Sequence, residues 1–382
     1  MISIVHVITG LDTGGAEAAL SRIVPRLDRG RFSNAVVSLT DVGARGADLA
    51  RAGIPVVAIG MRRGVPTPTH VWRLARTIRR FRPSILQTWL PHADLLGTIV
   101  GSTLGIPSIC WNVRCAELDR SDHPSSLFLI LKVLARLSSK PACIVANSVA
   151  GREAHIAIGY RPARWELIPN GFDTDVFAPS REVRKAFRAR FAIPGDAPLV
   201  GLVARFHPMK DHATFIEAAS RVARLRPEVH FLMAGKGVDP TNARLMDAVR
   251  AKGIAHVTHL VGEIGDPAAL FPALDVAVSS SYSEAFPNVI GEAMACAVPC
   301  VVTNVGHSAQ IVGETGVVVP PRDATALSAG ILQVIAEEPP RRALLGEAAR
   351  ARVIAEFSLD AARKRYEDLY LQLATRGGGS TS

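Results

Sequence analysis

Two carboxylates eight residues apart flank a proline in the second half of the chain. Glu284 and Glu292 lie within residues 283–294, with Pro287 between them. Proline has a fixed φ and no amide hydrogen, so it suits the first position of a helix. We therefore expect Glu284 in a loop and Glu292 in the second helical turn. A strand expected over residues 275–279 leads into this loop, so the free amides of the helix should face the crevice where parallel sheets bind anions. The alternative is an ordinary junction whose acids complement the helix dipole.

Two cations follow the first expected strand of the second half. Arg205 comes just after the strand over residues 199–203, and Lys210 ends the loop that follows. Arginine offers a rigid fork of donors and lysine a mobile point charge, a pair that suits a diphosphate. The alternative is two solvated surface cations. The glycine turn at residues 235–237 is a weaker candidate for the phosphate side of such a site.

A glycine-containing loop lies near the amino terminus, between a strand over residues 4–8 and a helix over residues 18–27. Its Gly14 and Gly15 would let a ligand approach the backbone closely at the start of a helix. The spacing is not the Gly-x-Gly-x-x-Gly fingerprint of dinucleotide-binding proteins. Alone, the loop could equally be a simple turn.

Together these segments resemble the signature of the retaining nucleotide-sugar glycosyltransferases of family 4, which have the two-domain GT-B architecture. The family pattern is a glutamate, seven residues, a second glutamate, a helix of small residues, a short strand and a glycine turn. Residues 296–306 match the strand and the turn. The resemblance implies an α/β fold of two Rossmann-like parallel-sheet domains that face each other across a cleft. It covers almost the whole chain and is strongest over residues 198–321.

The resemblance also implies a role for each matching residue. In the family, the residues that match Arg205 and Lys210 hold the donor diphosphate and neutralise charge on the leaving group. Glu284 would bind sugar hydroxyls and Glu292 the ribose hydroxyls, while the loop of Gly14 and Gly15 would face the diphosphate. Backbone amides in one short segment would hold sugar and phosphate oxygens; its residues are Phe286, Pro287, Asn288 and Val289.

The acceptor side departs from the family pattern. The family has a histidine after the fifth strand, where this chain has Arg114. Arg114 is therefore the candidate that replaces it in catalysis. His92 or Asp94, after the preceding strand, could orient the acceptor, although either could also simply start a helix. The leaving phosphate could itself take the acceptor proton, so a protein base is not required.

No metal and no other cofactor are expected. Asp173 and Asp175 spell the Asp-x-Asp metal signature of a different glycosyltransferase architecture, but they follow an Asn-Gly turn instead of a strand. Arg205 and Lys210 would offset the charge that a metal otherwise carries. The five cysteines lack paired Cys-x-x-Cys spacing, which favours free thiols in a reducing compartment; they are Cys110, Cys115, Cys143, Cys296 and Cys300.

Length and patterning predict two domains. A chain of 382 residues, 48% hydrophobic, exceeds what one core usually serves. Short β-branched runs alternate with helical periods, which indicates repeated βα units. The expected strands are residues 3–8, 35–39, 56–59, 85–88, 108–111, 142–146 and 166–168 in the first half, and 199–203, 230–234, 257–260, 276–279, 299–302 and 317–319 in the second.

The domain boundary is expected near the charged stretch at residues 180–190. The first domain would span residues 1–178 and be completed by a carboxyl-terminal helix at about 359–374, which the resemblance predicts will cross back onto it. The second domain would span residues 179–357. The tail over residues 376–382 is polar and rich in glycine, so we expect it to be disordered.

The formal charge of +10 lies mostly in residues 1–178. Five arginines share an expected helix over residues 71–82; they are Arg73, Arg76, Arg79, Arg80 and Arg82. A solvated helix face explains them, and attraction to anionic lipid is the alternative, at about 1 kcal/mol for each nearby basic residue. Residues 126–138 are apolar all round apart from Lys132 and Arg136, so they could form a core helix or lie on a membrane surface.

Other classes of partner and location find less support. The chain shows neither aromatic interleaving of its charges nor a groove-reading motif, so nucleic acid is not an expected partner. It contains no window of eighteen uncharged apolar residues, and its first strand begins at Ser3, so we expect neither a membrane span nor a signal peptide. The expected location is the cytoplasm, with the inner face of the cytoplasmic membrane as the alternative.

The expected reaction follows from the resemblance. A hexosyl or N-acetylhexosaminyl group would pass from a nucleotide diphosphate sugar, with UDP favoured, to a hydroxyl of a glycan or lipid-linked acceptor, with retention of anomeric configuration and without metal. Cell-surface polysaccharide or lipopolysaccharide synthesis is the expected setting. The alternatives are a sugar-nucleotide epimerase or phosphorylase of the same architecture, and a noncatalytic assembly protein that binds sugar nucleotides. The sequence leaves the sugar, the base and the acceptor open.

Overall fold

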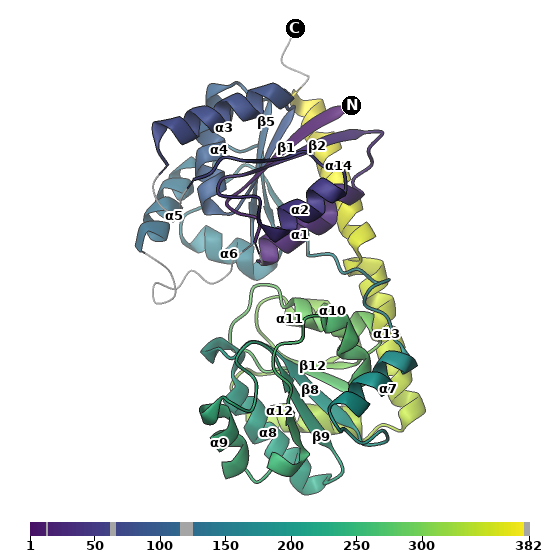
Figure 1. Cartoon of the computed structure of the whole chain (residues 1–382). Helices are drawn as coiled ribbons and strands as arrows, with labels where there is room; N and C mark the ends of the chain where they lie inside the picture. The colour runs from purple at the N-terminus through teal and green to yellow at the C-terminus, as the bar shows by residue number, and fades with distance from the viewer. Residues whose placement is uncertain (13, 62–65, 115–124, 378–382) are drawn as a thin grey trace. The chain divides into compact units, whose positions relative to one another are not determined.

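The computed structural model describes residues 1–12, 14–61, 66–114 and 125–377 (Figure 1). The chain divides into two compact units. The first unit comprises Met1–Gly171 and Leu359–Ser382, and the second comprises Phe172–Ser358. Each unit has its own parallel sheet with helices packed against it, so the expected α/β fold of two Rossmann-like parallel-sheet domains is confirmed.

The first unit contains a seven-stranded parallel sheet in the order β3-β2-β1-β4-β5-β6-β7. Its strands are β1 (Ile2–Ile8), β2 (Phe32–Ser38), β3 (Val56–Ala58), β4 (Ile85–Trp89), β5 (Ser108–Val113), β6 (Cys143–Ala146) and β7 (Trp165–Leu167). Every strand expected in this half is present. The largest difference is at β2, which begins at Phe32 instead of Ala35. The Phe32 ring is buried against Tyr370, and the polar Asn34 bonds His6 on β1 at 3.0 Å, so a strand continues where the sequence is polar.

Among the described residues, six α-helices of the first unit precede the second unit in sequence, and one follows it. They are α1 (Gly15–Ile23), α2 (Gly43–Arg51), α3 (Pro68–Phe81), α4 (Pro91–Thr103), α5 (Ser125–Leu137), α6 (Val149–Ala157) and α14 (Leu359–Gly377).

The last helix, α14, packs into the first unit. Glu367 accepts a hydrogen bond from the amide of Asp28 at 2.9 Å, and Ser108 donates to the carbonyl of Leu373 at 3.2 Å. Tyr366 and Tyr370 are buried in the same core as Trp89. These contacts show how the end of the chain completes the unit that its beginning forms. Of the tail expected over residues 376–382, positions 378–382 lie outside the described residues.

The second unit contains a six-stranded parallel sheet in the order β10-β9-β8-β11-β12-β13. Its strands are β8 (Leu199–Val203), β9 (His230–Ala234), β10 (Thr258–Leu260), β11 (Val276–Ser279), β12 (Cys300–Thr303) and β13 (Val317–Val319). Its helices are α7 (Arg181–Arg190), α8 (His212–Leu225), α9 (Ala243–Ala251), α10 (Asn288–Ala295), α11 (Ser308–Val312), α12 (Ala324–Ile335) and α13 (Pro339–Phe357). All six expected strands are present, and four of them match the expected residues at both ends.

The second unit begins at Phe172, earlier than the expected boundary at residue 179. The cause is the Phe172 side chain, which is buried and stacks on the ring of Phe286 at 6.0 Å. Gly291 makes room for it, because a Cβ at Gly291 would overlap the Phe172 ring. The Phe172 amide also donates to the carbonyl of Phe357 at 2.8 Å, which joins the two ends of the unit.

The charged stretch that follows the expected boundary is helix α7 of the second unit. Arg184 and Arg188 both bond the carboxylate of Asp275, at 2.9 and 2.7 Å. The same carboxylate accepts from the amide of Leu199 at 2.8 Å. These charges neutralise one another against the start of β11, which holds α7 to the sheet.

Asp275→Asn should destabilise the second unit. The substitution leaves two guanidinium groups around a neutral amide, and breaking a largely buried ion pair costs about 3 kcal/mol. Urea unfolding followed by far-ultraviolet circular dichroism measures the effect. Asp247→Asn is the matched control, because Asp247 pairs with Arg250 on an exposed helix face and such pairs contribute less than about 1 kcal/mol. Equal midpoints for the two variants would contradict the structural role of Asp275.

Candidate active site

Each sheet has one place where the strand order reverses, and all candidate residues except Arg114, which follows β5, come after the strands at these two places. The order reverses between β1 and β4 in the first unit and between β8 and β11 in the second. Open parallel sheets bind ligands beyond the carboxyl ends of the strands at such points, because adjacent loops there diverge and leave a crevice. These candidates, identified from the sequence, therefore lie at the two positions where open parallel sheets usually bind ligands.

In the second unit, the two expected ligand segments meet. The Lys210 ammonium forms an ion pair with Oε1 of Glu284, and both side chains are mostly buried, at 19% and 11% exposure. Ser281 donates to the same carboxylate oxygen at 2.8 Å. The loops are also joined through their backbones, since the Tyr282 amide donates to the carbonyl of Met209 at 2.9 Å. Side-chain and backbone contacts thus hold the two loops together.

Arg205 is the second cation at this edge, and it is exposed. Within the described part of the chain it forms no hydrogen bond or ion pair. The turn at residues 235–237 lies beside it: the Phe206 amide donates to the carbonyl of Lys236 at 2.8 Å, and a Cβ at Gly235 would overlap the carbonyl of Ala204. The turn and the free guanidinium group therefore share one side of the site.

The helix after Glu284 begins one residue later than expected. Asn288 is the first helical residue, and Pro287 occupies the cap position with φ −77° and ψ 97°. The expectation that Pro287 is the first helical residue is wrong, because its extended ψ ends the loop instead of starting the turn. No side chain among the described residues caps this helix. Glu292 lies in the second turn and is buried, and Val289 lies in the first.

The loop that carries Glu284 rests on residues that sequence analysis did not single out. His307 stacks on Phe286 with ring centres 5.2 Å apart, and Thr303 donates to the carbonyl of Ser281 at 2.6 Å. Burial lowers the pKa of His307 to about 4, so the ring is neutral at pH 7. Gly306 has φ +56°, and a Cβ there would overlap the carbonyl of Glu284. The glycine turn in the sequence was the available signal for this contact.

In the first unit, the loop after β1 brings bare backbone to the start of α1. Gly14 is the cap residue, with an extended φ of −115°, and Gly15 is the first helical residue. A Cβ at Gly15 would meet nothing within 4 Å, whereas one at Gly14 would meet the carboxylate of Glu17. Burial raises the pKa of Glu17 above its ordinary value. Gly14 and Gly15 thus begin a helix beside the Glu17 carboxylate, and their phosphate-side role stays a prediction.

The loop after β4 contains an unusual backbone conformation. Leu90 has φ +78° and ψ +154°, a region that is essentially restricted to glycine, and α4 follows at once. Half-buried His92 has a pKa lowered by burial, so its imidazole is neutral at pH 7. Asp94 is buried, accepts from the Thr88 hydroxyl at 2.5 Å, and has a pKa that burial raises well above its ordinary value. Of the two acceptor-side candidates, His92 is the more accessible.

Arg114 sits in a network within the first unit. Its Nε donates to Asn112 at 3.0 Å, its Nη2 donates to the Tyr366 hydroxyl at 2.8 Å, and its Nη1 bonds Asn170. The guanidinium carbon also lies 4.8 Å from the ring centre of Trp89. These contacts join the end of β5 to α14 and to the last residues of Met1–Gly171. The catalytic role of Arg114 stays a prediction, and its positioning contacts are what the structure adds.

The acidic pair considered as a metal signature forms a turn. Oδ1 of Asp173 accepts from the amides of Asp175 and Val176 at 3.3 and 3.2 Å. The described residues contain no group of three or more side chains arranged to hold a metal ion. Cys110, Cys143, Cys296 and Cys300 are buried free thiols, and Cys115 lies outside the described residues.

Both halves of the chain match known protein families. Residues 183–352 match the family of group 1 glycosyl transferases. Residues 14–171 match the glycosyl transferase 4-like domain. Both units are glycosyltransferase domains. The candidate residues after β8 and β11 all lie within the first match, and those after β1 and β4 lie within the second.

Individual relatives support this assignment. The chain is 28% identical to the lipopolysaccharide core biosynthesis glycosyltransferase LpsE of Rhizobium meliloti, over 77% of this chain and 76% of that protein. It is 25% identical to a GDP-mannose-dependent monoacylated phosphatidylinositol monomannoside mannosyltransferase of Corynebacterium glutamicum, over 80% and 81%.

Solved structures support the fold. Anabaena Alr3699/HepE in complex with UDP matches with a TM-score of 0.82 at 22% identity, over 97% of this chain and 100% of that one. The complex of the same protein with UDP-glucose matches with a TM-score of 0.79. The two parallel-sheet domains therefore have the GT-B architecture.

Gly306→Ala should impair glycosyl transfer without unfolding the protein. An alanine at φ +56° costs about 1 kcal/mol, and its Cβ would push the Glu284 carbonyl away from its place. We expect at least a tenfold slower transfer rate, since small displacements of a positioned group have large effects. Gly265→Ala is the control, because a Cβ there meets nothing within 4 Å. A variant as active as the control would show that this contact does not position Glu284.

Proposed function

We propose that the chain is a retaining, metal-independent glycosyltransferase that uses a nucleotide diphosphate sugar, with UDP as the nucleotide. The observation that carries the proposal is the set of three charged groups where the strand order of the second unit reverses. Lys210 and Glu284 are paired there, and Arg205 is unpaired among the described residues. One net positive charge and one carboxylate suit a ligand that has a diphosphate at one end and hydroxyls at the other.

The pair of Lys210 and Glu284 gives the donor two complementary contacts. A diphosphate that takes Lys210 frees the Glu284 carboxylate to accept from sugar hydroxyls, and Ser281 continues to orient that carboxylate. Arg205 and Lys210 then stabilise charge on the phosphate oxygen as its bond to the anomeric carbon breaks. The acceptor oxygen bonds that carbon from the same face, and its proton passes to the leaving phosphate. Glu292 binds the ribose, and the amides of residues 286–289 hold sugar and phosphate oxygens.

The first unit supplies the acceptor side in this proposal. His92 is neutral at pH 7 and follows the strained Leu90, so it can accept or donate a hydrogen bond to an acceptor hydroxyl. Gly14 and Gly15 contribute helix-start amides toward the donor phosphates. Arg114 acts through the placement of its neighbours, because three of its nitrogens already bond within the unit.

The relatives support the choice of substrates. HepE has been crystallised with UDP and UDP-glucose, which supports a UDP-linked donor. LpsE acts in lipopolysaccharide core biosynthesis, which supports a cell-surface glycan or lipid-linked acceptor. The Corynebacterium relative uses GDP-mannose, so a donor panel must include both nucleotides.

Glu284→Gln should abolish transfer while the protein stays folded. The amide keeps an acceptor oxygen but loses the negative charge that pairs with Lys210 and strengthens hydrogen bonds from sugar hydroxyls, so we expect at least about a 100-fold loss of rate. The assay measures nucleotide release from UDP-glucose, UDP-N-acetylglucosamine, GDP-mannose and ADP-glucose, with lipopolysaccharide-core and polyprenol-linked acceptors and with EDTA. Glu347→Gln on the exposed face of α13 is the control.

Several outcomes would contradict the proposal. A fully active Glu284→Gln variant removes the role of that carboxylate, and activity lost in EDTA removes metal independence. A donor that changes without any acceptor indicates an epimerase. No use of any donor by the wild-type protein indicates a noncatalytic binding protein. The anomeric proton coupling in the product, measured by nuclear magnetic resonance, tests retention.

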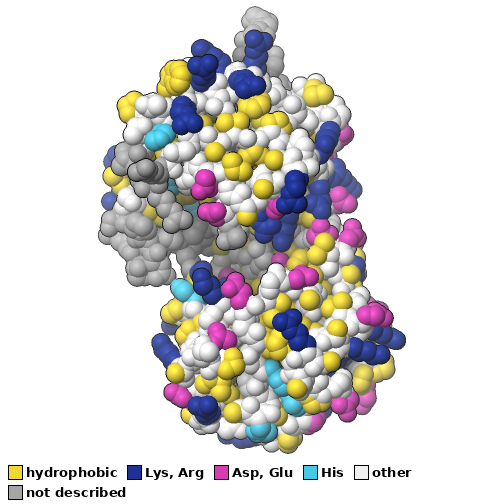
Figure 2. Space-filling view, viewed as in Figure 1, with side chains coloured by type: hydrophobic (Ala, Val, Ile, Leu, Met, Phe, Trp, Pro, Cys, Tyr) yellow, Lys and Arg dark blue, Asp and Glu magenta, His cyan; other side chains and the backbone are white. Residues whose placement is uncertain are grey.

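We also propose that the first unit contacts anionic lipid through α3, at the inner face of the cytoplasmic membrane. Its arginines are exposed around Trp72, which is 59% exposed and lies under the guanidinium of Arg76 at 5.3 Å. Figure 2 shows basic side chains gathered over this end of the first unit. By contrast, α5 buries Leu131 and Leu134 in the unit and exposes Leu129. One face of this helix therefore lies in the core. Within the described residues, none of the helices combines the length and apolar character of a membrane span.

Vesicle flotation tests this contact. The wild-type protein should float with phosphatidylglycerol-containing vesicles at low salt and less at moderate salt, because screening weakens the attraction. A variant with Arg73, Arg76, Arg79 and Arg80 changed to glutamine should remain in the dense fraction. A variant of the second unit that loses the same number of charges controls for net charge; in it Arg190, Arg224, Arg244 and Arg250 are changed to glutamine. Equal flotation of the two variants, or none for the wild type, would contradict a lipid contact through α3.

A further inference from the structure

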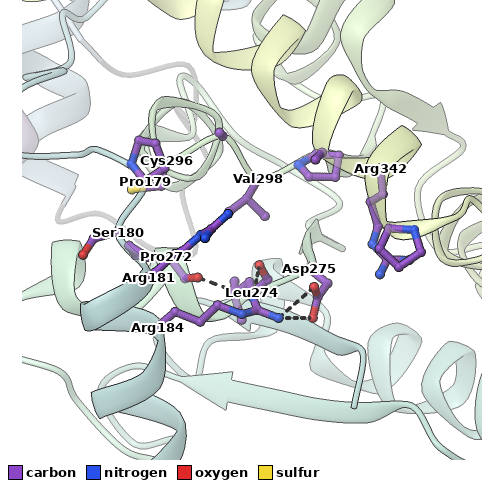
Figure 3. A pocket seen from close by; sticks show the side chains of 14 residues that line it. Pro179, Ser180, Arg181, Arg184, Pro272, Leu274, Asp275, Cys296, Val298 and Arg342 are labelled. Carbon is purple, nitrogen blue, oxygen red and sulfur yellow. Dashed lines mark hydrogen bonds and ion pairs between the residues drawn. The ribbon is translucent and has the colours of Figure 1, made fainter. Parts of the chain in front are cut away.

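The second unit contains a pocket at the opposite edge of its sheet from Lys210 and Glu284 (Figure 3). Its volume is about 430 Å³. Leu274 and Asp275 lead into β11, and Pro299 leads into β12, so the pocket lies where these strands begin. Lys210 and Glu284 belong to loops that lie beyond the ends of β8 and β11. The pocket is thus separate from the candidate donor site, and neither the sequence motifs nor the family roles account for it.

The pocket has an excess of positive charge. Three arginines and one aspartate line it; they are Arg181, Arg184, Arg342 and Asp275. Asp275 is already shared by Arg184 and by Arg188 behind it. Arg184 also donates to the carbonyls of Pro272, Ala273 and Leu274, so its donors are directed into the protein. The carboxylate therefore does not neutralise the other two arginines.

Arg181 and Arg342 line the pocket and retain unused donors. Arg181 is exposed and makes no hydrogen bond or ion pair in the described part of the chain, and Figure 3 shows its side chain extending toward Val298 across the pocket. Arg342 donates through Nη1 alone, to the carbonyls of Ile335 and Glu337. Its Nε and Nη2 have no bonding partner among the described residues. A guanidinium fork with free donors suits a phosphate or carboxylate.

The rest of the lining is apolar and conformationally restricted. Prolines contribute from four different segments; they are Pro179, Pro272, Pro299 and Pro339. Proline has little freedom to lose on binding, so the walls are largely preformed, which favours affinity. Leu274 and Val298 add aliphatic surface. A volume of about 430 Å³ lies at the small end of the range for ligand pockets, which favours a compact ligand over a nucleoside diphosphate.

We propose that this pocket is a second ligand site, which binds a small phosphorylated sugar. The phosphate monoester, a dianion at neutral pH, matches the two arginines that Asp275 does not neutralise. Arg181 binds the phosphate oxygens, and the positive charge of Arg342 adds to the electrostatic attraction of the phosphate. The sugar ring packs its C–H faces on the proline and aliphatic walls. This site does not depend on the identity of the donor or acceptor at the other edge of the sheet.

Isothermal titration with glucose 6-phosphate tests the proposal. Arg181→Gln should weaken binding at least tenfold, because one charge-assisted contact to phosphate is lost. The substitution should not unfold the protein, since Arg181 is exposed and an uncharged residue suits the start of a helix better. Arg190→Gln, on the same helix and outside the pocket, is the matched control. Arg205→Ala is the control for binding at the candidate donor site. Neither control should change the affinity for glucose 6-phosphate.

Glucose and inorganic phosphate are the two comparison ligands. Both should bind at least tenfold more weakly than glucose 6-phosphate, because each lacks one half of the recognised ligand. Equal affinity of the wild-type and Arg181→Gln proteins would overturn the proposal. Loss of binding in Arg205→Ala alone would assign the ligand to the donor edge. Inorganic phosphate bound as tightly as the sugar phosphate would mean an adventitious anion only, and no binding at about 10 mM would exclude the site.

Discussion

The ion pair between Lys210 and Glu284 is the interaction on which the candidate site depends. It joins loops that follow β8 and β11, adjacent strands that come from distant parts of the chain. Two mostly buried charges are costly to desolvate, and the cost is offset only when hydrogen bonds satisfy both partners. The Ser281 hydroxyl donates to the carboxylate at 2.8 Å, and Ser280 fixes the other loop by donating to the backbone carbonyl of Lys210 at 2.8 Å. The loops are therefore held in place before any ligand arrives.

Both units have candidate residues where the strand order reverses, but the charges of these residues differ between the units. In the second unit the groups beyond the strand ends are charged, and Arg205 adds an unpaired cation within the described residues. In the first unit burial drives the two candidates that follow β4 toward their neutral forms, since it lowers the pKa of His92 and raises that of Asp94. A charged site suits a diphosphate, whereas neutral groups suit a hydroxyl. This contrast agrees with a donor on the second unit and an acceptor on the first.

Much of the fold could be predicted because parallel strands are continuous apolar runs. β8, β9, β11 and β13 have the expected residues at both ends, whereas β2 extends into a polar segment that only its contacts with Tyr370 and His6 explain. The boundary was expected at residue 179 instead of Phe172 because the Phe172 ring packs on Phe286, far away in sequence. The motif located Lys210 and Glu284, but not their direct contact. The Arg114 network depends on Asn170 and Tyr366, which no local pattern connects to it.

The discontinuity of the first unit has a consequence for biosynthesis. Leu359–Ser382 completes a core that Met1–Gly171 begins, while Phe172–Ser358 is one uninterrupted segment. During translation, all strands of Phe172–Ser358 are synthesised before α14, the last helix of the first unit. Until α14 emerges, the surface that contacts Tyr366 and Tyr370 is uncovered. The amino-terminal part therefore stays incomplete while Phe172–Ser358 is synthesised. Its exposed apolar surface is prone to aggregation during that time.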